Sequence, residues 1–402
     1  MRVRIQLLLT TILLCQAIVK AEEPEITDSA HFVTASLLVM TPGEASYSSL
    51  GHCALRMECP SAHLDYCFSL EMDTGPDDYA RFFTGNAVAG VFGIPTDAFL
   101  KPYRDEGRGV TQYELNLTLE EKQLLWKNLD EEMVKPPHLR FNFLNTNCVM
   151  MCMMMIEGAL IDESIHFDHL PFYMLGNNGA KIRYITQDDP WQEFVYILLA
   201  GAACDKDYDI EYCMSPRTII EVLDSAEIQT TDGNRRSVLK GGPTSLIKPL
   251  ASTHSPTLSP FLLFSLLLLA VILITIAKWA MGARTICRLT DVALLVVQTL
   301  VGTILLYTST IANLFGTRWN WYLIPFLPIP ILLWLFFHKK PQFNKIYALY
   351  SIILGFFICA TPLSSQLDWT HQLPVMAMLV RTISLYFEGK QKKISVFTEK
   401  RN

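Results

Sequence analysis

A cysteine and a histidine in this sequence have the neighbours that a thiol nucleophile and its general base require. Cys148 follows Asn147 and opens the apolar stretch of residues 149–160, which predicts a helix. A helix N-terminus favours the thiolate over the thiol, so a cysteine placed there is activated as a nucleophile. His52 lies on a predicted strand, residues 51–58. A histidine beside the sulfur would act as general base and then protonate the leaving group.

The same two residues also have a purely structural explanation. A lone histidine on a strand is more often a satisfied structural residue, and a cysteine before a methionine-rich helix often belongs to the core. Histidine precedes cysteine here, which is the reverse of the order in ordinary papain-type enzymes. Residue type and spacing alone therefore favour the structural explanation.

Short strands alternate with helices through residues 22–238, the segment that carries both residues. Strands are expected at residues 32–41, 51–58 and 64–72, and helices at residues 117–134, 149–160 and 217–226. Thr118, followed by Glu120 and Glu121, is typical of a capped helix start. The alternation predicts one α+β domain of about 200 residues, enough for a single core.

The first residues are typical of an export signal. Arg2 and Arg4 precede an apolar core, and small residues end the segment at residue 21. We interpret residues 1–21 as a cleaved signal peptide. A lipoprotein signal with Cys15 as the lipidated residue fits less well, because Leu14 stands where a small residue is needed.

Five apolar stretches fill residues 259–388, and each is near the length of about 20 residues that crosses a bilayer. They are residues 260–280, 292–313, 319–337, 346–362 and 373–387. This predicts an all-α membrane domain of about five transmembrane helices. Residues 239–258, rich in Ser, Thr, Pro and Gly, are interpreted as a linker to it, and residues 389–402 as a basic tail.

Lysine and arginine gather in alternate connections of the membrane domain. They follow the first and third stretches and fill the tail, whereas the other two loops carry only Arg318. Positive residues mark the cytoplasmic side of a membrane. We therefore expect a multi-pass protein of a bacterial inner membrane, with a periplasmic N-terminal domain and a cytoplasmic tail.

Arg381 is a charge inside the last apolar stretch. A long arginine side chain often reaches the membrane interface, and such a position needs no functional explanation. Alternatively, the guanidinium is buried and faces a polar cleft between helices. The sequence favours the first explanation and leaves the second open.

Composition excludes some classes of function. The net charge is −6, and no basic stripe with interleaved aromatic residues appears, so we expect no nucleic-acid partner. Cys59, His63 and Cys67 are spaced loosely like metal ligands, but there is no Cys-x-x-Cys pair. We therefore expect neither a metal nor another cofactor. The expected partners are membrane lipids and a substrate in the cell envelope.

Several short motifs resemble a known family. They are Gly51-His52 with Leu55-Arg56, Gly107-Arg108-Gly109-Val110, Leu115-Asn116-Leu117-Thr118 and Arg140-Phe141-Asn142-Phe143 to Asn147-Cys148. In this order and spacing they resemble the Lnb N-terminal periplasmic domain family. The five apolar stretches, with Trp319-Asn320-Trp321, resemble the Lnb-like transmembrane domain that follows it.

That family is similar to the permuted papain-like enzymes, which include NlpC-like peptidases and lecithin:retinol acyltransferase-like proteins. The resemblance implies a permuted papain-like α+β fold for residues 22–238. It makes Cys148 the nucleophile and His52 the base. It also implies that Asn147, or the first amides of the helix, helps to stabilise an oxyanion.

The resemblance leaves the supporting residues of the site open. Cys67 stands where an asparagine is expected on the second strand, so Asp65 or His63 is the candidate for the third catalytic position. Arg56 and Arg108 match family positions. They are candidates either for binding an anionic group of the substrate or for holding the site together.

These expectations lead to one functional hypothesis and two alternatives. The hypothesis is a membrane-anchored periplasmic thiol hydrolase or acyltransferase that acts on an amide, thioester or ester of the envelope, in a peptidoglycan peptide or a lipid. The first alternative is a non-catalytic binding or assembly module that keeps the papain-like fold. The second is a membrane sensor or scaffold whose helices carry the function.

Overall fold

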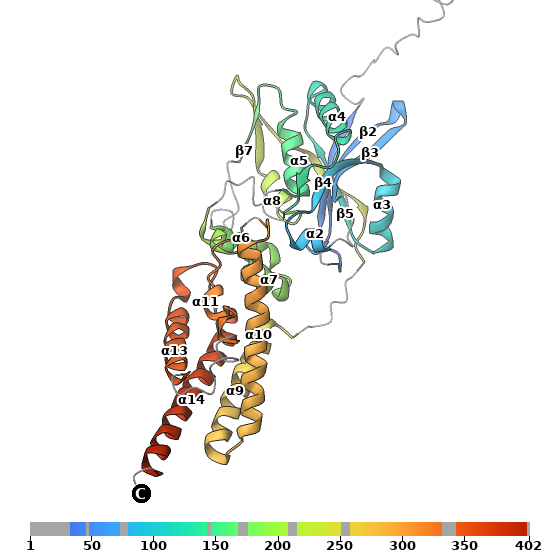
Figure 1. The fold of residues 1–402 in the computed structure, drawn as a ribbon. Helices are drawn as coiled ribbons and strands as arrows, with labels where there is room; N and C mark the ends of the chain where they lie inside the picture. The colour runs from blue at the N-terminus through green and yellow to red at the C-terminus, as the bar shows by residue number, and fades with distance from the viewer. Residues whose placement is uncertain are drawn as a thin grey trace, which may run out of the picture.

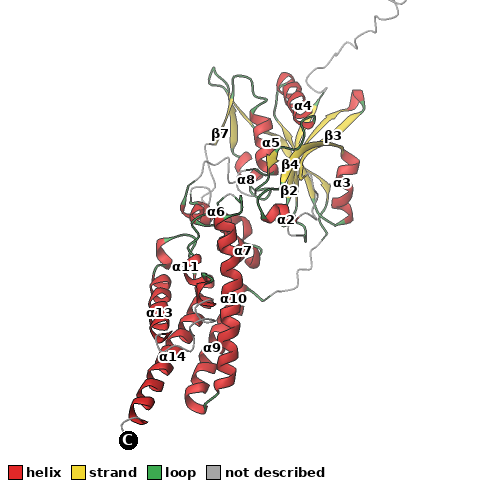
Figure 2. Cartoon of the chain, viewed as in Figure 1, coloured by secondary structure: helices red, strands yellow, loops and turns green. Residues whose placement is uncertain are grey.

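A computed structural model describes residues 33–45, 48–72, 79–142, 146–167, 176–207, 215–250, 258–314, 316–331 and 343–399 of the 402-residue chain. The N-terminal part combines β-sheet with helices, and the C-terminal part is a bundle of helices that extends away from the sheet (Figure 1, Figure 2). The mixed α/β region and the helical region expected from the sequence are both present. The expected signal peptide, residues 1–21, lies outside the described residues.

An antiparallel sheet forms the centre of the N-terminal part. Its described strands run in the order β10-β5-β1-β2-β3-β4-β6. They are β1 (Thr34–Met40), β2 (His52–Cys59), β3 (Leu64–Met72), β4 (Val88–Pro95), β5 (Val110–Leu115), β6 (Leu139–Arg140) and β10 (Leu239–Ile247). A small second sheet contains β7 (Ser164–Phe167), β8 (Ala226–Gln229) and β9 (Arg235–Ser237). The surrounding helices are α2 (Tyr79–Phe83), α3 (Thr96–Asp105), α4 (Leu119–Met133), α5 (Cys148–Glu157), α6 (Asn178–Thr186), α7 (Pro190–Leu199) and α8 (Ile219–Leu223).

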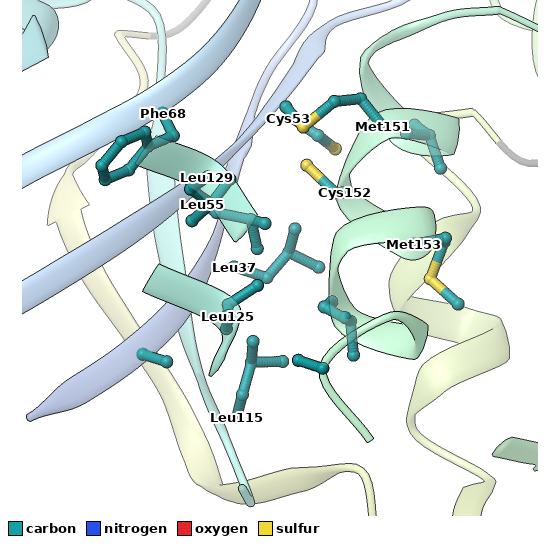
Figure 3. Packing of buried hydrophobic residues seen from close by; sticks show 14 of the residues in the cluster. Leu37, Cys53, Leu55, Phe68, Leu115, Leu125, Leu129, Met151, Cys152 and Met153 are labelled. Atoms are coloured by element: carbon teal, nitrogen blue, oxygen red, sulfur yellow. The ribbon is translucent and has the colours of Figure 1, made fainter. Parts of the chain in front are cut away.

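Helices cover both faces of the large sheet, because successive side chains of a strand point to opposite faces. On one face, Leu37 and Leu55 pack against Leu125 of α4 and Cys152 of α5 (Figure 3). On the other face, a smaller cluster packs against α3. Met151 and Met153 of α5 belong to the larger cluster and Met155 packs against it, whereas Met154 is exposed, so core packing explains part of the methionine-rich composition of this helix.

The start of α4 is fixed by the reciprocal hydrogen bonds that the sequence suggests. The Glu121 backbone N–H donates to Thr118 Oγ1 at 3.2 Å, and the Thr118 N–H donates to Glu121 Oε2 at 2.7 Å. This capping box satisfies backbone donors that a helix start otherwise leaves unpaired. Arg236 of β9 also donates to the Glu121 carboxylate, at 2.7 Å, and so ties the small sheet to α4.

Two expectations for residues 217–258 are corrected. The expected linker, residues 239–258, begins later, because Leu239–Ile247 pairs with β5 as the edge strand β10. Pro243 has no N–H to donate, and it lies at a shift of register between Lys240 and Thr244, where a sheet edge tolerates it. The helix expected at residues 217–226 is only the short α8, and Ala226 already starts β8.

The C-terminal part contains helices α9 (Pro260–Met281), α10 (Arg284–Thr310), α11 (Leu323–Phe326), α13 (Phe343–Cys359) and α14 (Trp369–Glu399), and the 3-10 turn η6 (Thr361–Leu363). Within the described part of the chain, two helices, α9 and α10, are long and apolar enough to cross a membrane unaided. The number of spans, five, therefore stays a prediction.

The third and fifth apolar stretches differ from simple spans. In the third, the described helical residues are the four of α11 and residues 329–331, since Pro325 and Pro328 interrupt regular hydrogen bonding. Residues 332–342 lie outside the described part. In the fifth, α14 continues to Glu399 because no proline follows Pro374. Residues 389–399 of the expected tail are thus the end of this helix.

Polar contacts join the two parts of the molecule. Asn320 Nδ2 donates to the Leu198 carbonyl of α7 at 2.7 Å. The Asp205 carboxylate accepts from Ser364 Oγ at 2.7 Å and from the Ser365 N–H at 2.6 Å. His371, on α14, is 2.8 Å from the Phe194 carbonyl through Nε2. The α/β part is therefore attached to the membrane helices at several points.

We predict that Thr118→Ala loosens α4, because loss of an N-cap hydrogen bond costs about 1 kcal/mol. Hydrogen exchange of a peptide covering residues 119–133, measured on the full-length protein, should become about fivefold faster. Thr118→Ser is the matched control, since it keeps the hydroxyl acceptor. Equal exchange rates for the alanine and serine variants would contradict the capping role.

Candidate active site

Gly51 forms the turn that immediately precedes His52, the first residue of β2. Gly51 has φ +86°, and a Cβ built on it would lie 2.6 Å from the Met40 carbonyl oxygen. A side chain is therefore excluded here both by conformation and by space. The turn places His52 opposite Met40 at the end of the β1–β2 pair, with its side chain 19% exposed.

Cys148 is the first residue of α5, as the sequence indicates. Asn147 precedes it as the N-cap, and its Oδ1 accepts a hydrogen bond from the Met150 N–H at 3.0 Å. The backbone N–H groups of Cys53 and Val149 donate to the Cys148 sulfur. Because α5 packs on β2, the first residues of the two elements come together.

His52 and Cys148 are hydrogen-bonded to each other, and this contact favours the charged form of each side chain. Burial alone would raise the pKa of Cys148, but the charge and hydrogen bond of His52 and the two backbone N–H groups lower it. Burial alone would lower the pKa of His52, yet the Cys148 thiolate, followed by Glu71, raises it to about 10. Both shifts favour the thiolate–imidazolium form of the pair.

Ser69 and Glu71 of β3 contact the Nε2 atom of the His52 imidazole. His52 Nε2 is 2.7 Å from Ser69 Oγ, and Ser69 Oγ donates to Glu71 Oε1 at 2.6 Å. Glu71 Oε1 is itself 3.6 Å from Nε2. Since Nε2 is engaged here, Nδ1 is the ring atom that faces the sulfur. Burial alone would raise the pKa of Glu71, but hydrogen bonds from His52 and Ser69 lower it.

Glu71 was not among the candidates from the sequence, although a signal for it exists. Ala54 pairs with Ser69 in the β2–β3 register, so two residues further along His52 stands opposite Glu71. The turn between the strands is short, with η2 (Pro60–Ala62) at its centre. Counting residues outward from that turn along both strands pairs His52 with Glu71. A carboxylate close to the turn, such as Asp65, does not reach His52.

Asp65, one of the two candidates for the third catalytic position, is placed elsewhere. It pairs with Glu58, six residues from His52, which corresponds to roughly 20 Å along a strand. Its carboxylate receives two hydrogen bonds from Arg56, at 2.8 and 2.7 Å, and one from Thr96 at 2.6 Å. Asp65 therefore does not support His52, and the reason is the pairing register.

Arg56 and Arg108 both hold the fold together. Arg56 is occupied by Asp65 and donates to Gln112 of β5 at 2.7 Å, so it joins strands away from His52. Arg108 is 8% exposed, donates to the Thr41 carbonyl at 2.8 Å and lies 4.7 Å from the centre of the Tyr103 ring. None of the described residues accepts a hydrogen bond from its Nη2, and Arg108 is not among the residues that line the pocket.

A pocket of about 130 Å³ contains the cysteine–histidine pair. Glu71, Asn147 and Lys181 are further polar residues of its wall. The apolar residues of the wall are Leu50, Leu70, Met72, Phe82, Phe141, Ile182, Ile185 and Pro216. Lys181 and Ile182 belong to α6, which packs on η4 (Ala202–Asp205) at the junction with the membrane helices. The pocket is thus mainly apolar and lies beside that junction.

No group of three or more metal-ligating side chains is found in the part of the chain that the structure describes. The nearest sequence candidates, Cys59, His63 and Cys67, are separated: Cys67 Sγ contacts Thr96 Oγ1 at 3.3 Å, whereas Cys59 Sγ lies 3.5 Å from Ser61 Oγ.

Comparison with known proteins identifies two domains. Residues 23–179 match the family described as Lnb N-terminal periplasmic domain, and residues 252–393 match the family described as Lnb transmembrane domain. No curated protein and no solved structure matches the chain. His52, Ser69, Glu71 and Cys148 all lie in the first match. The chain therefore belongs to the family of membrane-anchored proteins in which an Lnb N-terminal periplasmic domain is followed by an Lnb transmembrane domain.

Proposed function

We propose that this protein is a periplasmic thiol hydrolase or acyltransferase with a permuted papain-like active site, anchored in a bacterial inner membrane. The observation that carries the proposal is the hydrogen-bonded Cys148–His52 pair, with Ser69 and Glu71 behind the imidazole and a pocket in front of it. If Cys148 only packed in the core, it would not need a charged histidine beside it. If His52 were only structural, it would not need a cysteine at a helix start. Core packing alone therefore does not account for the pair.

The reaction follows from the positions of these groups. The Cys148 thiolate attacks the carbonyl carbon of an amide, thioester or ester, and the carbonyl oxygen becomes an oxyanion. We assign stabilisation of this negative charge to Asn147 or to backbone N–H groups at the start of α5. His52 then protonates the leaving group as the carbon–heteroatom bond breaks, leaving an acyl-thioester on Cys148.

The second half of the reaction decides between hydrolase and transferase. His52, now neutral, accepts a proton from the incoming nucleophile, which attacks the thioester carbonyl and releases the Cys148 thiolate. Water as the nucleophile gives hydrolysis, and an amine or alcohol gives acyl transfer. Glu71, through Ser69, favours the imidazolium and keeps the ring oriented through both steps.

The wall of the pocket supports an acyl group with an apolar chain. Eight apolar side chains line the pocket, and α6 brings the pocket next to the membrane junction. Between the two classes of envelope substrate, a lipid therefore fits the lining better than a peptidoglycan peptide. The periplasmic position of the site and the cytoplasmic position of the tail rest on the distribution of lysine and arginine.

We predict an acyl-enzyme on Cys148. Full-length protein incubated with p-nitrophenyl palmitate or p-nitrophenyl acetate should gain the acyl mass on the peptide that contains Cys148, and more rapidly with palmitate. His52→Ala should slow acylation by about a hundredfold or more, the range of general acid–base catalysis. His138→Ala, at an exposed histidine outside the pocket, is the control. A Cys148 that alkylates readily but never acylates would favour the binding-module alternative.

The pH dependence of alkylation tests the ion pair itself. Because His52 stays protonated below about pH 10, it stabilises the thiolate through the neutral range. Iodoacetamide labelling of Cys148 should therefore be half-maximal below about pH 8.5, the pKa of a free thiol. In His52→Ala only burial and the backbone amides remain, so the midpoint should move upward. A midpoint that does not depend on His52 would refute the pair.

The role of Glu71 is tested on the same signal. Glu71→Gln removes the charge that supports the imidazolium, so the pKa of His52 should fall and that of Cys148 should rise. Labelling should therefore reach half its maximum at a higher pH than in the wild type, by one pH unit for each unit of pKa. Asp65→Asn on the same strand is the matched control and should label at the wild-type rate. Equal effects of both variants would argue against the relay.

A further inference from the structure

A second and larger cavity lies in the membrane domain, away from the thiol site. Its volume is about 970 Å³, within the size range of ligand pockets. It is formed by the end of α9, the first half of α10, and residues of α11, α13 and α14. The α9–α10 turn and the C-terminal end of α14 lie at the end of the bundle remote from the sheet (Figure 1).

Two ion pairs balance part of the charge around this cavity. Arg381 is 2% exposed, and its guanidinium makes two hydrogen bonds to Asp291, at 2.6 and 3.0 Å, and one to Thr275 Oγ1 at 2.8 Å. The arginine is thus buried and paired, which corrects the expectation that it reaches the membrane interface. Lys278 of α9 is paired with Glu388 of α14.

Two arginines supply a surplus of positive charge. Four cationic and two anionic side chains line the cavity, which leaves a net charge of +2. Arg284 and Arg288 account for the difference, since Lys278 and Arg381 are the paired cations. Both arginines are exposed, and they lie one helical turn apart on α10. Among the described residues neither has an acidic partner.

The remaining wall is mainly apolar, with Gln298, Thr382, Gln391 and two tyrosines as its polar members, so the cavity combines a cationic rim with a largely apolar interior. Leu295, Leu327, Ile353 and Met378 are examples of this lining. Two guanidinium groups suit a phosphate, whose oxygens accept paired hydrogen bonds. An inorganic phosphate would leave the apolar wall uncovered, whereas acyl chains would cover it.

We propose that this cavity binds an anionic glycerophospholipid, with its phosphate between Arg284 and Arg288 and an acyl chain along the apolar wall. The Arg381–Asp291 pair fixes α10 to α14 and so keeps the cavity open behind the two arginines. The site is independent of the thiol chemistry. It places a bound lipid at the opposite end of the helices from the pocket of Cys148.

The test is lipid retention by the full-length protein, measured by native mass spectrometry with added phosphatidylglycerol. The expected result is one phosphatidylglycerol bound per chain, with a Kd raised about tenfold or more in the double variant Arg284→Gln/Arg288→Gln. Arg318→Gln, at an exposed arginine outside the cavity, is the control and should bind as the wild type does. Equal binding by the double variant would overturn the proposal.

Two further measurements distinguish a lipid in this cavity from a lipid bound elsewhere and from a free anion. Leu295→Trp fills the cavity without changing its charge, so it should also weaken lipid binding, whereas unchanged binding would place the lipid elsewhere. Inorganic phosphate at the same concentration should not displace the lipid. Displacement by inorganic phosphate would mean that the arginines bind a free anion, and would overturn the lipid assignment. Iodoacetamide labelling of Cys148 reports that each variant remains folded.

Discussion

An imidazolium buried between a thiolate and a carboxylate is stable only because each charge has a partner within the same small volume. Removing the partner of a buried charge leaves that charge uncompensated, which costs far more than the pair contributes. The turn at Gly51, the cap at Asn147 and the pairing of β2 with β3 each place one member of this set. The position of the large sheet relative to α5 is therefore constrained by electrostatics as well as by packing.

The junction between the two domains uses a different kind of bonding. Its contacts include hydrogen bonds to main-chain carbonyls, such as that from Asn320 to Leu198, and hydrogen bonds from neutral donors to a carboxylate, such as that from Ser364 to Asp205. Such bonds depend on direction, so they fix orientation as well as contact. Because α6 contributes both to the pocket wall and to this junction, the shape of the pocket depends on how the helical domain is seated.

The sequence predicted those parts of the molecule that depend on local patterns. Strands β1 to β3 were recognised from alternation, and α4 from Thr118 and the acids that follow it. His52 and Cys148 were recognised because each has a distinctive immediate neighbour. Local pattern does not indicate Glu71, because its role comes from pairing across a hairpin, and residue type alone points to Asp65 or His63 instead. The sequence predicts a linker where β10 lies, since an edge strand is held mainly through its backbone and tolerates Gly-Gly-Pro.

The α/β domain is fastened to the helical domain by several separate hydrogen bonds, at Asn320, Asp205 and His371. A body held at several points cannot swing as a domain on a single flexible tether does. The mouth of the pocket is therefore kept at a constant distance from the transmembrane domain, and a substrate must come to that position before it can enter.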